Sequence, residues 1–193
     1  KVPAHIVAYV KKAVRAAYKD PVRWRDFALS ADGARTAPKL TSPVGLSPKN
    51  SPRRTPDNIL DEDLRSASCW MFSGDRAQVG IRLPSFIYPT HFTLDYVPFE
   101  VAADIRQAPR EVVLWGVLDG PDNWRRYEAS KESIGMSPLR GIGDGPPITD
   151  IASFVPLAVV EFNIHDSLHI QTFIIDSTIL ASRISFGVFV LDV

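Results

Sequence analysis

Residues 69–116 decide the fold of this chain, and they read CWMFSGDRAQVGIRLPSFIYPTHFTLDYVPFEVAADIRQAPREVVLWG. Two stretches place apolar side chains at every second position: Val79, Ile81 and Leu83, then Phe92, Leu94 and Tyr96. Alternation with a period of two, interrupted by Gly, Pro and Asp, is typical of β-strands joined by turns. The segment therefore predicts several short strands.

Similar strand signals continue through the rest of the chain. Segments rich in β-branched and aromatic residues, separated by turn residues, occur at residues 69–72, 77–83, 91–97, 111–117, 124–129, 158–164, 168–175 and 185–191. No helical period of comparable length separates them, which argues against a parallel sheet with crossover helices. The pattern predicts an all-β fold, an antiparallel jelly-roll β-sandwich of the galactose-binding-like kind with about eight strands.

Residues 1–25 are predicted to form a separate helical segment ahead of the sandwich domain, which we place at residues 26–193. Apolar residues recur at helical spacing on a narrow stripe: Val2, Ile6, Val10, Ala13 and Ala17. A helix this short is not stable in isolation in water. It either packs on its own domain or forms the last turns of a coiled coil in a homo-oligomer.

Residues 36–57 differ from their surroundings because they contain five prolines among small and polar residues. Such a stretch buries little apolar surface and is predicted to be a long mobile loop. Its basic cluster, Lys49, Arg53 and Arg54, is interpreted as a solvated surface, the alternative being a docking patch for an acidic partner. Residues 137–149 are glycine- and proline-rich and are predicted to be a flexible connection between strands.

Composition excludes several classes of protein. The 22 basic and 22 acidic residues cancel, so no electrostatic footprint for nucleic acid or an anionic membrane is visible. The single cysteine, Cys69, excludes an intrachain disulfide. The longest apolar stretch, residues 154–160, falls far short of the ~20 residues that a membrane-spanning helix needs. Because the sequence begins at Lys1, we expect a fragment of a longer protein whose membrane anchor lies elsewhere.

Residues that could carry chemistry do not form a convincing set. His165 and His169 lie four apart, but on a predicted strand end this spacing separates them by ~13 Å, so no metal site is expected. No Gly-x-Ser-x-Gly motif occurs, and Cys69 beside Trp70 is interpreted as a small apolar residue. We therefore expect no enzyme. Trp70, Trp115 and Trp124 are predicted to fill the core, with a carbohydrate-binding face as the alternative.

Six ordered blocks of the sequence resemble the SUN-domain family. They are DFALSADGA (residues 26–34), CWMF followed by SG (69–74), VGIRL (79–83), YPTHFTLDYVP (88–98), IRQAPREVVLWG (105–116) and VVEFNI (159–164). Their family counterparts include C-W-A-F-x-G for the second block and I-S-S-A-P-K-D-[FV]-x-[VI]-[FY]-G for the fifth. Single blocks are weak signals, but six in the family's order are specific.

The resemblance implies a binding module. SUN domains form trimers through a preceding coiled coil and hold the C-terminal tails of KASH proteins in grooves between neighbouring protomers. They do so in the space between the two nuclear membranes, linking the nucleoskeleton to the cytoskeleton. A flexible lid adds to the KASH strand by β-augmentation. The corresponding lid here is residues 41–57, and we assign to it and its flank Thr41, Leu46 and Ile59.

The resemblance also implies residue roles. Tyr96 and Gln107 occupy the positions of a pocket histidine and a pocket serine, and both side chains can hydrogen-bond a terminal carboxylate. The pocket tyrosine aligns near Ser182. The loop of residues 59–68, with Asp63 and Ser68, resembles the family's cation-holding loop. No cofactor is expected beyond a monovalent cation such as potassium.

Three departures from the family pattern point to a divergent member. The family's second cysteine falls at Ile184, its lid cysteine falls at Thr41, and the proline-rich lid pairs poorly as a hairpin. Fold and trimer-type assembly therefore follow from the resemblance more directly than affinity for KASH tails. The alternative function is a SUN-like jelly roll of the endoplasmic reticulum that binds other protein, lipid or glycan ligands.

Overall fold

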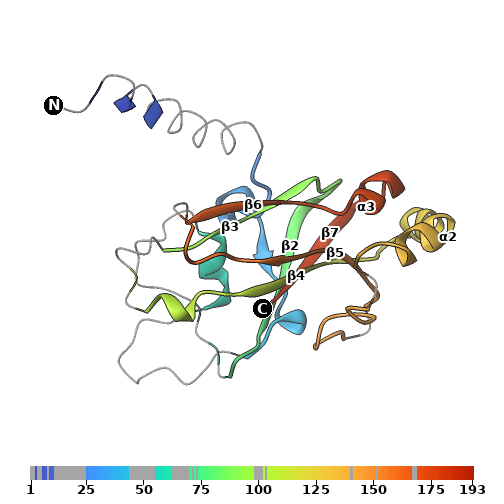
Figure 1. Ribbon diagram of the computed structural model, residues 1–193. Helices are drawn as coiled ribbons and strands as arrows, with labels where there is room; N and C mark the ends of the chain where they lie inside the picture. Colours follow the sequence, from blue (N-terminus) through green and yellow to red (C-terminus); the bar gives the residue numbers. More distant parts are fainter. Residues whose placement is uncertain are drawn as a thin grey trace.

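A computed structural model gives the three-dimensional structure of the chain (Figure 1). It describes residues 25–43, 55–61, 74–97, 104–139, 141–150, 152–166 and 169–193, together with Pro3, Ile6, Val7, Tyr9, Val10, Trp70, Phe72 and Ala102. The strands are β1 (Arg35–Thr36), β2 (Gln78–Ile87), β3 (His91–Asp95), β4 (Glu111–Val117), β5 (Phe154–Glu161), β6 (Ile170–Ile174) and β7 (Phe186–Asp192). The helices are α2 (Pro121–Gly135) and α3 (Ser177–Ser182), with short 3-10 turns η2 (Ser30–Asp32), η3 (Pro38–Leu40), η4 (Pro56–Leu60) and η5 (Ile105–Gln107).

The strands form two antiparallel sheets. One has five strands in the order β1-β2-β7-β4-β5, and the other pairs β3 with β6. The chain alternates between the sheets, passing from β2 to β3, back to β4 and β5, then to β6 and back to β7. This alternation is the jelly-roll arrangement of a two-layered sandwich. The predicted antiparallel jelly-roll sandwich is therefore confirmed.

Strand β4 shows why its sequence is almost continuously hydrophobic. Val112 and Leu114 are buried on the inner face of the sheet, where Leu114 packs into the core between the two sheets with Leu157 and Phe186. Trp115 points to the opposite face and packs with Val190 in a second core cluster. Because both faces of the strand are covered, alternation between apolar and polar residues is not required.

The outer face of the five-stranded sheet is covered by connecting segments. Leu40 of η3, together with Ile142 and Ala152, packs against Trp115. The predicted flexible connection at residues 137–149 is thus a non-repetitive segment that shields one face of the sheet. Gln78, which is 1% exposed, joins these segments because its amide donates to the carbonyl oxygens of Leu40 (3.0 Å) and Ile148 (2.8 Å).

The predicted strand at residues 124–129 is wrong, because this segment lies inside helix α2. Gly120, at φ +83°, and Pro121 at the first helical position start the helix. Asn123, Tyr127 and Ile134 recur at helical spacing on the side that faces the protein. Consequently Trp124 is 41% exposed on a helix and does not fill the core, whereas Trp115 does.

Two further predictions concern the N-terminal part of the chain. Ile6, Val7, Tyr9 and Val10 are helical, as predicted, and the remainder of the expected helix lies largely outside the described residues. Trp70 and Phe72, predicted to be in a strand, are not in one, while Cys69 and Met71 lie outside the described residues. Among the described residues, no helix combines the length and the apolar character needed to cross a bilayer.

Candidate peptide-binding site

Tyr96 and Gln107 both lie at the end of the sandwich where β4 begins and β5 ends. Tyr96 follows β3, and its backbone N–H donates to the carbonyl oxygen of His169 just before β6 (3.2 Å). Its ring meets Phe162 edge-on at a centroid distance of 6.1 Å. Gln107 ends η5, is exposed, and precedes β4 by a few residues. The structure thus places these two predicted residues at one end of the fold.

Several residues at this end were not predicted to belong to the site. The register Asp95↔Ile170 continues to Tyr96 and His169, which therefore oppose each other at the open end of the β3–β6 pair. Gln171 and Asn163 are joined by two hydrogen bonds of 2.7 and 3.0 Å that connect β6 to the end of β5. Only the pairing of β3 with β6 reveals this group, and a single sequence does not specify which strands pair.

Several charged side chains lie at this end of the sandwich. Burial raises the pKa of Asp95, and the nearby His169 opposes that effect. The pKa of Asp104 is lowered by hydrogen bonds from the side chain and backbone of Arg106. Arg110 and Glu161 form an exposed ion pair at 3.2 Å. The Arg106 and Arg110 guanidinium groups therefore lie on the rim beside Gln107 with carboxylate partners of their own.

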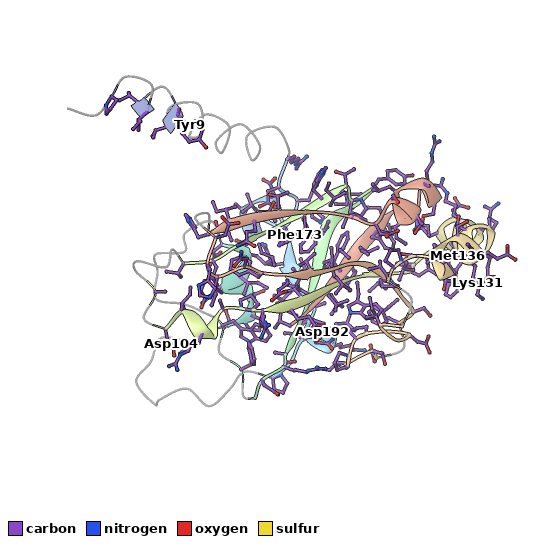
Figure 2. All side chains as sticks on the ribbon, in the orientation of Figure 1. Tyr9, Asp104, Lys131, Met136, Phe173 and Asp192 are labelled. Atoms are coloured by element: carbon purple, nitrogen blue, oxygen red, sulfur yellow. The ribbon has the colours of Figure 1, made fainter. Side chains whose placement is uncertain are left out.

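Ser182 does not join Tyr96 and Gln107 within one copy of the chain. It lies at the end of α3, buried, and its hydroxyl donates to the carbonyl oxygen of Ile179 (2.7 Å). Helix α3 packs beside α2 at the far end of the sandwich (Figure 1). Figure 2 shows the two ends clearly, with Asp104 at one and Lys131 and Met136 at the other.

The two ends of the predicted lid are fixed to the β1 side of the five-stranded sheet. On one side, Thr41 Oγ1 accepts from the Gly80 N–H (3.1 Å), and Ser42 exchanges two hydrogen bonds with Gln78. On the other side, Asp57 of η4 accepts from the backbone and hydroxyl of Thr36 on β1 (3.2 and 2.6 Å). Ile59 is 38% exposed within η4, whereas Leu46 lies outside the described residues.

Some of the remaining residues singled out in the sequence lie outside the described part of the chain, and the others lie within it. Asp63 and Ser68, expected in a cation-holding loop, and Cys69 lie outside the described residues. Ile184, at the position of the family's second cysteine, is 2% exposed in the central core. His165 and His169 lie in the turn before β6, as predicted, and the described part of the chain contains no group of three or more His, Cys, Asp or Glu side chains arranged to hold a metal.

The fold and this polar end define a jelly-roll β-sandwich module. Residues 49–131 match the family model described as Sad1 / UNC-like C-terminal. Among curated proteins, human SUN domain-containing protein 5 is 34% identical over 68 residues, covering 34% of this chain and 18% of that protein. Bovine SUN domain-containing protein 3 is 30% identical over 130 residues, covering 60% of this chain and 34% of that protein.

Mouse sperm-associated antigen 4 protein is 32% identical over 127 residues, covering 59% of this chain and 28% of that protein. The chain is therefore similar to SUN-domain proteins over part of its length, and it spans about a third or less of the length of these three relatives. A solved structure, the family 32 carbohydrate-binding module from Streptococcus pneumoniae EndoD, aligns with a TM-score of 0.49 and 14% identity, covering 88% of this chain and 85% of that one.

Proposed function

We propose that this chain is a non-enzymatic binding module that holds the C-terminal tail of a KASH-type protein in the perinuclear space. In that role it connects the two nuclear membranes mechanically, as part of an assembly of several copies. The similarity of residues 49–131 to the SUN-domain family model and of the chain to SUN domain-containing protein 3 supports this proposal. The positions of the lid anchors and of Tyr96 and Gln107 support a particular geometry for it.

The observation that decides the geometry of the proposed site is the separation of the lid anchors from Tyr96 and Gln107 across one sheet. The lid is anchored beside β1, at one edge of the five-stranded sheet, and Tyr96 and Gln107 lie beside β4 and β5, at the other edge. Four strand spacings of 4.7–4.9 Å put these edges about 19 Å apart. A tail that pairs with the lid as an added strand runs along β1 and therefore does not approach Tyr96 of the same copy.

A groove between two neighbouring copies removes this difficulty. The lid of one copy can pair with the tail while the β4–β5 end of the next copy receives the terminal carboxylate. The Tyr96 hydroxyl and the Gln107 amide provide neutral donors there, and His169 provides a side chain that can be charged. Ser182 is not part of this proposed pocket, because its hydroxyl is buried on α3.

Calorimetric titration with synthetic KASH tails tests the proposal. The free-acid tail is expected to bind, and its C-terminal amide to bind about tenfold more weakly, since a hydrogen bond to a charged group contributes about 1.5–3 kcal/mol. Tyr96→Phe and Gln107→Ala should reduce the difference between acid and amide. Tyr88→Phe, at the other end of the sandwich, is the matched control and should leave both affinities unchanged.

The outcomes separate the parts of the proposal. Absence of binding by any tail, acid or amide, would show that the chain does not serve KASH proteins. If the free-acid tail and its amide bind with equal affinity, the proposed contact to the terminal carboxylate is wrong, while the proposal that the chain binds the tail still stands. Hits on a glycan array that are lost when exposed aromatic residues are replaced would instead support carbohydrate binding.

A further inference from the structure

A strip of exposed aromatic, aliphatic and arginine side chains lies at the end of the sandwich opposite Tyr96 and Gln107. It is formed by the end of β2, the β2–β3 connection, α2, and α3 with the residue that follows it, and we name it the Tyr88 strip: Phe86, Tyr88, Arg126, Leu180 and Arg183. Phe86 is 53% exposed, Tyr88 59% and Leu180 37%. Large aromatic side chains are usually buried, so three exposed apolar residues next to two arginines need an explanation.

Three side chains of the strip, those of Arg126, Tyr88 and Phe86, make contacts that hold them in place. Arg126 donates to the Tyr88 hydroxyl (3.2 Å) and to the carbonyl oxygen of Arg183. The Phe86 ring lies against the backbone of Gly187, where an added Cβ would be 3.3 Å from the ring. Because these contacts restrict the rotamers of Arg126, Tyr88 and Phe86, a partner that binds the strip would lose little conformational entropy in ordering these three side chains.

Arg183 occupies a conformation that ordinarily favours glycine. It follows α3 with φ +54° and ψ +35°, the left-handed region, at the position where helices often end in glycine. A non-glycine residue there is uncommon, and residues held in such regions are found preferentially at functional sites.

The charges of the strip are not compensated within the described part of the chain. Arg126 donates to neutral oxygen atoms, and neither it nor Arg183 forms an ion pair there. The neighbouring cations of α2 do have partners, since Arg125 pairs with Asp122 and Lys131 lies 3.5 Å from Glu128. The Arg126 guanidinium beside Tyr88 and the exposed Arg183 side chain thus remain available for anionic groups of a ligand.

We propose that the Tyr88 strip binds an acidic segment of a partner protein, in which carboxylates flank a large apolar side chain. The carboxylates pair with Arg126 and Arg183, and the apolar side chain packs against Phe86, Tyr88 and Leu180. Tyr, Phe and Arg are the residue types enriched at protein–protein interfaces, and arginine favours planar, two-pronged pairing with carboxylates. A lipid surface fits less well, because the other arginine and lysine of this helix are already paired with acids and the chain has no net charge.

A defined peptide tests this proposal by fluorescence polarisation and by NMR. The probe is a labelled Gly-Glu-Asp-Glu-Leu-Trp-Glu-Asp-Glu-Gly peptide, and its control has Gln and Asn in place of Glu and Asp. The acidic peptide is expected to bind at least about tenfold more tightly than the neutral one, because two charge-assisted pairs are lost in the control. The backbone amide signals that shift should belong to residues 86–88, 126 and 180–183.

Matched variants identify the arginines involved. Arg126→Gln and Arg183→Gln should each weaken binding about tenfold, whereas Arg125→Gln, on the same helix but paired with Asp122, should not. Arg183→Gly should weaken binding equally while raising the melting temperature, since glycine adopts the left-handed conformation without strain. A variant that binds more weakly but is more stable shows that the Arg183 side chain contributes to binding and not merely to the stability of the fold.

Each contrary result would overturn the proposal. One such result is a neutral peptide that binds as tightly as the acidic peptide. Another is an Arg125→Gln variant that loses as much affinity as Arg126→Gln and Arg183→Gln. A third is an absence of any change in fluorescence polarisation at millimolar acidic peptide. Binding of phosphatidylserine vesicles that Arg126→Gln and Arg183→Gln abolish, without binding of the peptide, would assign the strip to a lipid surface instead. Binding of KASH tails at the β4–β5 end is expected to be unchanged in all these variants, so the two sites can be judged independently.

Discussion

Gly116 lies where β4 passes beneath the ring of Phe186, and the contact leaves no room for a side chain. A Cβ added at Gly116 would be 2.4 Å from a ring carbon of Phe186, which is fully buried in the central core. Real Cβ atoms do not approach this closely, so either the strand or the ring must move. Glycine is required here by the close approach of β4 and β7, two neighbouring interior strands of the sheet.

Gly116→Ala should therefore destabilise the protein by about 1–3 kcal/mol, the usual cost of overpacking a core. Gly135→Ala is the matched control, because an added Cβ meets nothing within 4 Å and the position lies in the last turn of α2. That change should be neutral or stabilising by up to about 1 kcal/mol. Urea unfolding of both variants measures the difference, and equal stabilities would show that the core yields at Gly116.

Asp176 caps the N-terminus of α3 and gives the fold a dependence on pH. Burial acts to raise its pKa, but hydrogen bonds from the side chains of Thr178 and Ser137 and from backbone N–H groups outweigh that effect and lower it. A carboxyl group whose pKa is lower in the folded state contributes stability above its unfolded pKa of about 3.9. That contribution disappears as the pH falls below this value toward the folded pKa.

Asp176→Ala should accordingly cost about 1 kcal/mol at pH 7 and less at pH 3, where the wild-type cap is losing its charge. Asp176→Asn keeps a capping side chain without a titrating group, so most of the stability at pH 7 should remain. Thermal unfolding of the three proteins between pH 2.5 and 7 provides the measurement. If the difference in stability between wild type and Asp176→Ala stayed constant over this pH range, the charge of Asp176 would not contribute to capping α3.

At the scale of elements, the segments that cover the outer face of the large sheet depend on one buried amide. Gln78 donates to Leu40 and Ile148 and accepts from the Ile148 N–H (2.7 Å). It thereby holds both η3, next to the lid anchor, and the connection before β5. A buried polar group that loses its partner costs about 1–3 kcal/mol.

Gln78→Met keeps the size of the side chain but removes all three hydrogen bonds. We expect a loss of at least about 2 kcal/mol of unfolding free energy, together with faster hydrogen exchange at the Ile148 amide. Gln107→Met, at an exposed position, should change stability by less than about 0.5 kcal/mol. Unchanged exchange at Ile148 in Gln78→Met would show that other contacts hold the connection.

The elements also show what the sequence could predict. The predicted segment 111–117 is the strand β4, because a run as apolar as VVLWGV is buried on both faces. Helix α2 was missed because the residues at 124–129 alone resemble a strand, and only the spacing of Asn123, Tyr127 and Ile134 reveals a helical face. Which strands pair is not encoded locally, so the approach of His169 to Tyr96 could not be predicted.

On the scale of the whole molecule, the proposed function requires an assembly of several copies. Tyr96 and Gln107, predicted from the family resemblance, lie at one end of the sandwich, whereas Ser182 lies at the opposite end, where the hydroxyl of this residue of α3 is turned inward. The lid anchors and the β4–β5 end lie at opposite edges of one sheet. If the chain binds a tail as proposed, neighbouring copies share each tail, as in a closed ring of head-to-tail contacts.

Mixed assemblies test this sharing directly. One variant has residues 44–54 replaced by a Gly-Ser linker, which removes the lid, and the other carries Tyr96→Phe with Gln107→Ala. Each variant alone should fail to bind the free-acid tail. Co-expressed with two affinity tags and purified through both, they should regain about one tail per trimer, because one groove then combines an intact lid with an intact pocket. If every copy used its own lid and pocket, the mixture would bind no tail, and failure to recover both tags together would contradict the assembly itself.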